Sequence, residues 1–155
     1  MKRALSLGFA GLLTATLLNV TALAGPIAPG DVKIVDGEIA KSLTGKPGSS
    51  VKGAEWFKNR KLGNCLACHV NSKMPKEQFH GEVGPTLDGV ADRYTEAQLR
   101  AIVVNSKAVF GDATLMPAFY RDTGFTRPRK QFAGKSILTA DQVEDILAYL
   151  LTLKE

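Results

Sequence analysis

Two cysteines separated by two residues, with a histidine directly after the second, constrain this 155-residue chain more than any other feature. The segment reads Cys65-Leu66-Ala67-Cys68-His69. This spacing is typical of covalent haem attachment, because each thiol can add to one vinyl group of the porphyrin and a short turn matches the distance between the vinyls. The imidazole that follows lies under the iron, where it is a suitable axial ligand. We therefore predict one covalent haem c held by Cys65 and Cys68, with His69 on the iron.

Two other uses of closely spaced cysteines agree less well with the surrounding sequence. A thioredoxin-like redox pair opens a helix after a β-strand, but residues 58–64 contain no β-branched apolar run. A structural zinc site needs a second, separated pair of ligands, and His80 stands alone as the other histidine. The chain has no further cysteine for a disulfide, and thioether bonds to haem would consume both thiols.

The first 24 residues have the layout of a secretory signal peptide. A positive start at residues 1–3 precedes a mostly apolar stretch, and Ala22-Leu23-Ala24 is a small-residue cleavage signal. Polar residues inside the stretch argue against the alternative, an uncleaved membrane anchor. We expect cleavage after Ala24 and a mature periplasmic chain with no membrane span.

The charge of the chain is only mildly basic. The formal net charge is +5, and removal of residues 1–24 leaves 18 Lys and Arg against 15 Asp and Glu, a balance of +3. The remaining 131 residues are enough for one domain. This small excess of positive charge would favour acidic redox partners. Nucleic-acid binding has no support, because the sequence has no basic face interleaved with aromatic residues.

The opposite face of the iron needs a second ligand, and the mature chain offers Met74, Met116 and His80. Met74 follows His69 too closely to pass round the porphyrin edge. Met116 lies far enough downstream to return across the ring, and Pro117 favours an extended loop there. Methionine often fills a core instead. We predict Met116 as the distal ligand, which raises the reduction potential relative to two imidazoles, and His80 is the alternative.

The apolar pattern predicts an all-α domain at residues 51–155, wrapped around one covalent haem, after an extended N-terminal arm at residues 25–50. Gly, Pro and Ser interrupt any periodicity in the arm. A helix is expected over residues 54–61. Capping boxes begin two further helices, and an apolar face continues the last one at helical spacing. The boxes are Thr95 with Gln98 and Thr139 with Gln142.

Several motifs resemble the class I cytochrome c family: His69 with a distal methionine, Gly84-Pro85-Thr86-Leu87 between them, and a final helix carrying Tyr149. The segment from Gly53 to Phe57 fits the family's Gly-x-x-x-aromatic pattern. The resemblance implies that this first helix crosses the last one. It also implies that the Pro85 carbonyl accepts the His69 N–H, which would orient the imidazole and make it a better donor. An ordinary turn proline is the alternative.

Longer stretches are similar to SoxX, the family of monohaem subunits of the SoxAX cytochromes in bacterial sulfur oxidation. They are residues 42–48, 59–69, 79–85 and 116–120. The similarity implies a heterodimer with SoxA that oxidatively joins thiosulfate to a cysteine of the carrier protein SoxYZ, an L-cysteine S-thiosulfotransferase reaction. In that family the sulfur chemistry occurs at the SoxA haem, and SoxX passes electrons to a soluble cytochrome c.

The residues agree with this division of labour, because no cysteine remains to hold a sulfur intermediate and a methionine-bound haem has no open coordination site. We therefore expect no catalysis by this chain alone. A freestanding electron-shuttle cytochrome c is the alternative function, and a thiol–disulfide oxidoreductase would need both cysteines free. The two candidate partner surfaces are the arm at residues 25–50 and the segment 117–138, which is rich in aromatics and arginines. The alternative for the second segment is that its aromatics cover the distal side of the haem. Arg93 and Tyr94 could meet a haem propionate or be ordinary surface residues.

Overall fold

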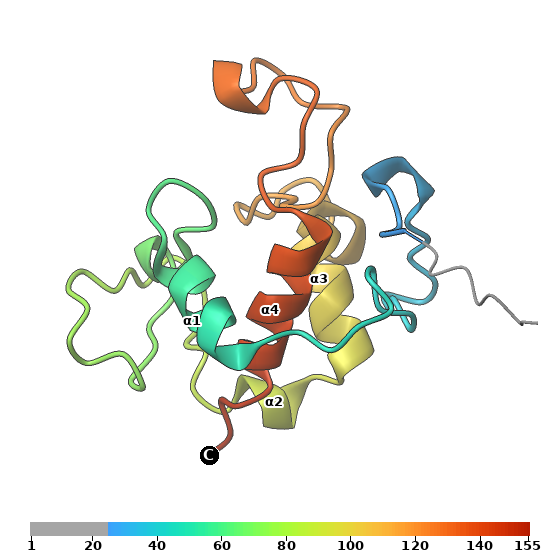
Figure 1. Ribbon diagram of the computed structural model, residues 1–155. Coiled ribbons are helices and arrows are strands. Elements are labelled where there is room, and N and C mark those ends of the chain that lie inside the picture. The colour runs from blue at the N-terminus through green and yellow to red at the C-terminus, as the bar shows by residue number, and fades with distance from the viewer. Residues whose placement is uncertain (1–24) are drawn as a thin grey trace, which may run out of the picture.

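A computed structural model describes residues 25–155, which contain four α-helices joined by long irregular segments (Figure 1). No β-strand occurs among these residues, so the all-α prediction is confirmed. The predicted signal peptide and its cleavage after Ala24 lie outside the described part of the chain. Between residues 25 and 155, no helix has the length and apolar character needed to cross a bilayer. The α-helices are α1 (Ser50–Lys58), α2 (Val90–Arg93), α3 (Glu96–Phe110) and α4 (Ala140–Leu150), and the short 3-10 helices are η1 (Pro29–Asp31), η2 (Cys65–Ala67) and η3 (Lys130–Phe132).

Side-chain caps determine where the longer helices begin. At α3 the Thr95 hydroxyl accepts the Gln98 N–H (3.2 Å) and the Gln98 side chain accepts the Thr95 N–H (2.9 Å). The same reciprocal pair begins α4 at residues 139–142, so both predicted capping boxes are confirmed. The first helix starts at residue 50 and not at 54, because the Ser49 hydroxyl accepts the Lys52 N–H (3.4 Å). It also ends earlier than predicted, at residue 58.

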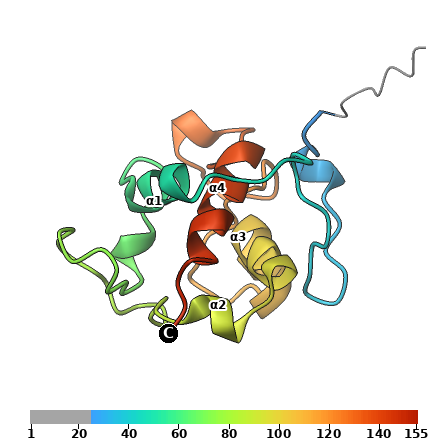
Figure 2. The ribbon, with the colours of Figure 1, turned by 60° about the horizontal axis from the view of Figure 1, so that its bottom comes forward.

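Helix α4 lies between α1 and α3 in both ribbon views, and α1 crosses it closely (Figures 1 and 2). Gly53 lies at the crossing, where a Cβ atom would be 1.9 Å from the Asp145 carbonyl oxygen. The rings of Phe57 and Tyr149 meet edge to face with centroids 5.4 Å apart. The Asp145 carboxylate accepts the Trp56 indole N–H at 3.2 Å. The predicted crossing of the Gly-x-x-x-aromatic helix with the last helix is therefore confirmed, and it depends on the missing glycine side chain.

The N-terminal arm is extended, but it packs along the helices. Ile39 and Leu43 are buried in the core of the domain. The Ile27 N–H donates to the Leu43 carbonyl (2.8 Å), and the Tyr120 hydroxyl donates to the Ile27 carbonyl (2.7 Å). The Ile39 N–H donates to the carbonyl of Ala97 near the start of α3 (3.0 Å). Residues of the arm therefore contribute to the core, which the lack of periodicity did not indicate.

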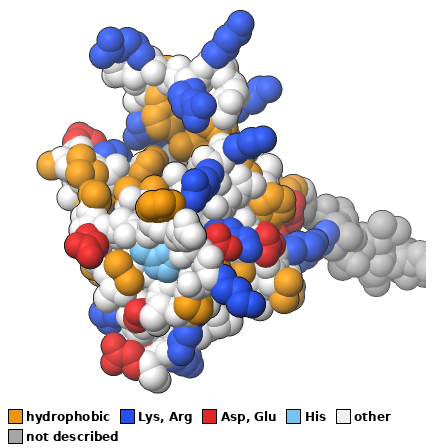
Figure 3. Space-filling view, turned by 90° about the vertical axis from the view of Figure 1, so that its left-hand side faces the viewer, with side chains coloured by type: hydrophobic (Ala, Val, Ile, Leu, Met, Phe, Trp, Pro, Cys, Tyr) orange, Lys and Arg blue, Asp and Glu red, His pale blue; other side chains and the backbone are white. Residues whose placement is uncertain are grey.

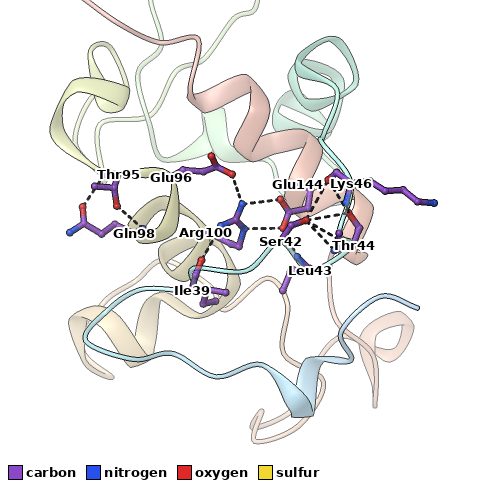
Figure 4. A network of polar contacts seen from close by, with 11 residues as sticks. Ile39, Ser42, Leu43, Thr44, Lys46, Thr95, Glu96, Gln98, Arg100 and Glu144 are labelled. Carbon is purple, nitrogen blue, oxygen red and sulfur yellow. Dashed lines mark hydrogen bonds and ion pairs between the residues drawn. The ribbon is translucent and has the colours of Figure 1, made fainter. Parts of the chain in front are cut away.

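A buried ion pair between α3 and α4 holds the arm in place (Figure 4). The side chains of Arg100 and Glu144 are 3% and 5% exposed, with Arg100 Nε 2.9 Å from Glu144 Oε1. The same carboxylate oxygen accepts the Leu43 N–H (2.8 Å), and Arg100 donates to the Ile39 carbonyl (2.9 Å). Arg100 also pairs with Glu96. Charged side chains that are removed from water need ionic or hydrogen-bonding partners. The ion pair therefore holds the arm, and the backbone of the arm supplies hydrogen bonds to the ion pair.

Candidate functional site

The two cysteines lie in a single tight turn that follows α1 and packs against the core. Asn64 has a left-handed backbone (φ 47°) immediately before η2. The N–H groups of Cys68 and His69 both donate to the Cys65 carbonyl, at 3.1 and 3.0 Å. This turn presents the thiols and the imidazole from one short segment. The side chain between them, Leu66, is buried and anchors the turn.

Both thiols are unpaired, and the surroundings of Cys65 do not suit thiolate chemistry. Cys65 is half-buried as a residue, but desolvation of its sulfur raises the pKa of the thiol to about 12. A thiol–disulfide oxidoreductase instead needs a depressed thiol pKa. Within residues 25–155, no group of three or more His, Cys, Asp or Glu side chains is arranged to hold a metal ion. Neither the redox-pair alternative nor the zinc alternative is supported by this geometry.

The His69 ring is held in one orientation by the segment that follows it. His69 Nδ1 lies 2.7 Å from the Pro85 carbonyl oxygen. A carbonyl can only accept, so Nδ1 carries the proton and Nε2 is the nitrogen left for a metal. The ring packs against the backbone of Gly84, where a Cβ atom would lie 2.3 Å from His69 Cε1. Glycine at position 84 is therefore required by the position of the imidazole.

The loop that carries Met116 is seated on a break in α3. Asn105 has non-helical dihedral angles (φ −152°, ψ 81°) inside this helix. The carbonyls of Val103 and Val104, just before the break, accept the N–H groups of Phe119 and Tyr120 at 3.3 and 3.1 Å. The segment that follows Met116 is therefore hydrogen-bonded to the helix backbone where the helical pattern is interrupted.

Two side chains just after the break hold the residues around Met116. Ser106 is fully buried, and its hydroxyl lies 2.7 Å from the Met116 carbonyl oxygen and 3.2 Å from that of Pro117. The Lys107 ammonium donates to the Thr114 carbonyl. Met116 itself is partly buried against the core. Sequence reasoning missed Ser106, although its helical spacing from Leu99 and Val103 places a polar residue on the buried face of α3.

The remaining candidates occupy structural positions. His80 Nδ1 accepts the Asn71 N–H (3.3 Å), and its Nε2 is buried without a hydrogen-bond partner among the described residues. Met74 is partly buried against the core. Arg93 donates to the carbonyls of Thr86 and Asp88, at 2.7 and 2.6 Å, and so braces the turn after Pro85. Tyr94 is 37% exposed.

These residues fit a covalently held haem. Both thiols are free, the His69 Nε2 is uncommitted, and Gly84 leaves the space that the imidazole occupies. Figure 3 looks at the side of the molecule that bears the segment after α1, and it shows a histidine with several hydrophobic side chains nearby and acidic side chains farther to either side. An apolar surface around an imidazole suits a porphyrin, whose faces are apolar.

Comparisons with known proteins agree with this site. Residues 50–154 match the cytochrome c family. A solved structure, the crystal structure of SoxXA from P. pantotrophus, is similar with 47% sequence identity and a TM-score of 0.78, and the match covers 84% of this chain and 99% of that one. No curated protein matches the chain significantly. The chain therefore belongs to the cytochrome c family, as a SoxX-type cytochrome that carries covalently bound haem c.

Proposed function

We propose that this chain is the electron-accepting subunit of a SoxAX complex in the periplasm, exported by a signal peptide that is cleaved after Ala24. The similarity to the SoxXA structure, which extends over 99% of that chain, carries this proposal. The complex would join thiosulfate to a cysteine of SoxYZ, forming one sulfur–sulfur bond with the release of two electrons and the thiol proton. A SoxA partner performs that step, and this chain passes the electrons singly to a soluble cytochrome c.

The proposed haem site uses residues from three parts of the chain. Cys65 and Cys68 would hold the porphyrin covalently, and His69 and Met116 would be the two side chains that bind its iron. When bound, the haem supplies one-electron oxidation and reduction of its iron. The Pro85 carbonyl keeps the proton on His69 Nδ1, which leaves Nε2 as the metal donor.

The remaining residues keep the two proposed ligands in place during electron transfer. The α3 backbone and Ser106 hold the loop around Met116. Because His69 and Met116 would both bind the iron, the site would leave no position on it for substrate. The proposed role is therefore electron transfer without contact with the sulfur substrate.

Two measurements test the proposed function. The intact mass of the purified chain should equal the mass of residues 25–155 plus that of one haem. The haem should remain attached after acid denaturation. In a mixture of thiosulfate, SoxYZ, SoxA and a soluble cytochrome c, reduction of that cytochrome should require both SoxA and this chain. Turnover at the same rate without SoxA would contradict the proposal, and a native protein that elutes as a lone small cytochrome would favour a freestanding electron shuttle.

Replacing Ser106 with alanine is expected to loosen Met116 without removing it. The change leaves the Met116 and Pro117 carbonyls without their shared donor, a loss of about 1–3 kcal/mol for a buried group. External imidazole should therefore displace the methionine from the ferric iron about tenfold more readily, as measured by a spectrophotometric titration. Ser136→Ala is a matched control, because that hydroxyl donates to the Leu138 carbonyl (2.6 Å) and not to the Met116 or Pro117 carbonyl. Equal imidazole affinity in both variants would contradict the assigned role of Ser106.

A further inference from the structure

Residues 121–135 form a cationic lobe that stands apart from the rest of the domain. The segment containing η3 projects away from the helices (Figure 1), and Lys and Arg side chains gather at the same end of the molecule in Figure 3. The lobe has five Lys and Arg residues and one Asp. The other described residues have 13 basic and 14 acidic side chains. The lobe thus accounts for the whole positive excess of residues 25–155.

The lobe contributes little to the fold that carries it. Its base is closed where the Leu138 N–H donates to the Phe119 carbonyl (3.0 Å). No hydrogen bond joins residues 121–135 to the remainder of the described chain, and none of these residues belongs to the hydrophobic core. None of the lobe's cations is in an ion pair with any residue between 25 and 155. Such a long irregular excursion in a compact domain is usually functional.

The backbone of the lobe is also strained at one position, and no contact within the lobe explains the strain. Arg127 has a positive φ of 54°, a region that non-glycine side chains rarely adopt. Residues 126–131 are all exposed, so no packing within the chain holds Arg127 there. Half-buried Phe125 and Phe132 flank this exposed run, and Arg121 stacks on the Phe125 ring at 4.7 Å. Strain that the fold does not need is consistent with a functional role.

The other candidate partner surface, the arm at residues 25–50, is already occupied. Ile39 and Leu43 lie in the core, and both backbones are tied to the buried pair of Arg100 and Glu144. Apart from Val35, which is 64% exposed, the large apolar side chains of the arm therefore pack against the core, whereas the arginines and aromatics of the lobe do not. Arginine and aromatic side chains are those that most often dominate binding energy at protein interfaces.

We propose that the cationic lobe, and not the arm, is the element that docks this chain on its SoxA partner, by entering a recess lined with Asp and Glu side chains. This inference rests on the proposed function, which supplies the partner. The exposed cations need carboxylates once they are removed from water, and paired charges also orient and accelerate association. The two half-buried phenylalanines supply apolar contact at the base of the recess.

Charge reversal tests the proposal on haem-loaded chain and its cognate SoxA. The lobe variant carries Arg127→Glu, Arg129→Glu and Lys130→Glu, all at exposed positions without partners. We expect its dissociation constant for SoxA, measured by titration calorimetry, to rise about 100-fold or more, because each reversed charge now meets a like charge. The wild-type constant should rise with salt concentration, and the variant should lose that dependence.

A control variant separates the lobe from net charge. Lys33→Glu, Lys41→Glu and Lys46→Glu together make the same charge change on exposed positions of the arm. Affinity for SoxA should change by less than about threefold. An equal loss of affinity in both variants would overturn the inference.

Further outcomes separate the inference from the proposed function. A wild-type chain that does not bind SoxA would refute both. Wild-type binding together with unchanged binding of the lobe variant would refute the docking role alone. A lobe variant that binds SoxA normally but reduces the soluble cytochrome more slowly would also overturn it, and would assign the lobe to the electron acceptor. The visible spectrum of the lobe variant should match that of the wild type, since the lobe makes no hydrogen bond to the haem-binding segments.

Discussion

Replacing Met116 with alanine is expected to lower the reduction potential of the haem by on the order of 100 mV, because the thioether that favours ferrous iron is lost. Potentiometric titration measures the change. The ferric spectrum should lose the near-infrared charge-transfer band of methionine-bound haem, and the reduced protein should bind carbon monoxide. Both results follow from an iron with one open axial position.

Met74→Ala is the matched control for this prediction. Met74 is also a partly buried methionine packed against the core, but it lies in the loop that follows His69. Its removal should leave the potential and the near-infrared band unchanged. If Met116→Ala kept both properties, or if Met74→Ala lost them, the proposed distal ligand would be wrong. His80→Ala then becomes informative, since His80 is the other candidate for that position.

Replacing Glu144 with alanine is expected to destabilise the haem-loaded chain by about 3–5 kcal/mol, measured by urea denaturation, because it removes the buried carboxylate and leaves the Arg100 guanidinium only the exposed Glu96 as a counterion. The change also removes the acceptor of the Leu43 N–H, so the arm loses an anchor in the same step. Limited proteolysis should then cleave within residues 25–45 sooner than in the wild type. The visible spectrum of the folded variant should persist, because Glu144 faces the arm rather than the haem-binding turn.

Two further variants sharpen this test. Glu96→Ala removes the other carboxylate that pairs with Arg100, but the Glu96 side chain is 56% exposed. Its loss should therefore cost less than about 1 kcal/mol. A double replacement, Arg100→Met with Glu144→Leu, should recover much of the lost stability, because no buried charge is left unpaired. Equal destabilisation by Glu96→Ala and Glu144→Ala would contradict this account of the ion pair.

The chemistry of the site could be predicted from the sequence because most of it is local. Cys65, Cys68 and His69 act through their spacing along a single turn, and both capping boxes depend on residues three positions apart. The crossing of α1 and α4 was predicted in a different way, through the resemblance to class I cytochromes c, whose Gly-x-x-x-aromatic pattern Gly53 and Phe57 match. The haem-binding turn and the capping boxes require only the covalent chain and short-range hydrogen bonds, which the order of residues specifies directly.

Features that depend on distant contacts could not be predicted in the same way. The arm has no periodicity because Ile39 and Leu43 reach the core as single side chains from an extended backbone. The break in α3 at Asn105 lies where the segment after Met116 is hydrogen-bonded to the helix. Because these partners are outside the helix, the sequence of the helix alone does not predict the break. Ser106 left one signal, a hydroxyl at helical spacing on an otherwise apolar face. A polar residue on the buried face of a helix indicates that another segment packs there and provides its hydrogen-bond partner.

The carboxylate of Glu144 also has a consequence for the order of events during folding. Leu43 and Glu144 are 101 positions apart, so the arm cannot dock until the last helix of the chain is in place. Contacts of such long sequence separation form slowly, because a large loop must close before they gain anything. A chain truncated before residue 140 should remain open to proteases, with Arg100 paired only with the exposed Glu96. Maturation of this cytochrome is thus timed by its last helix.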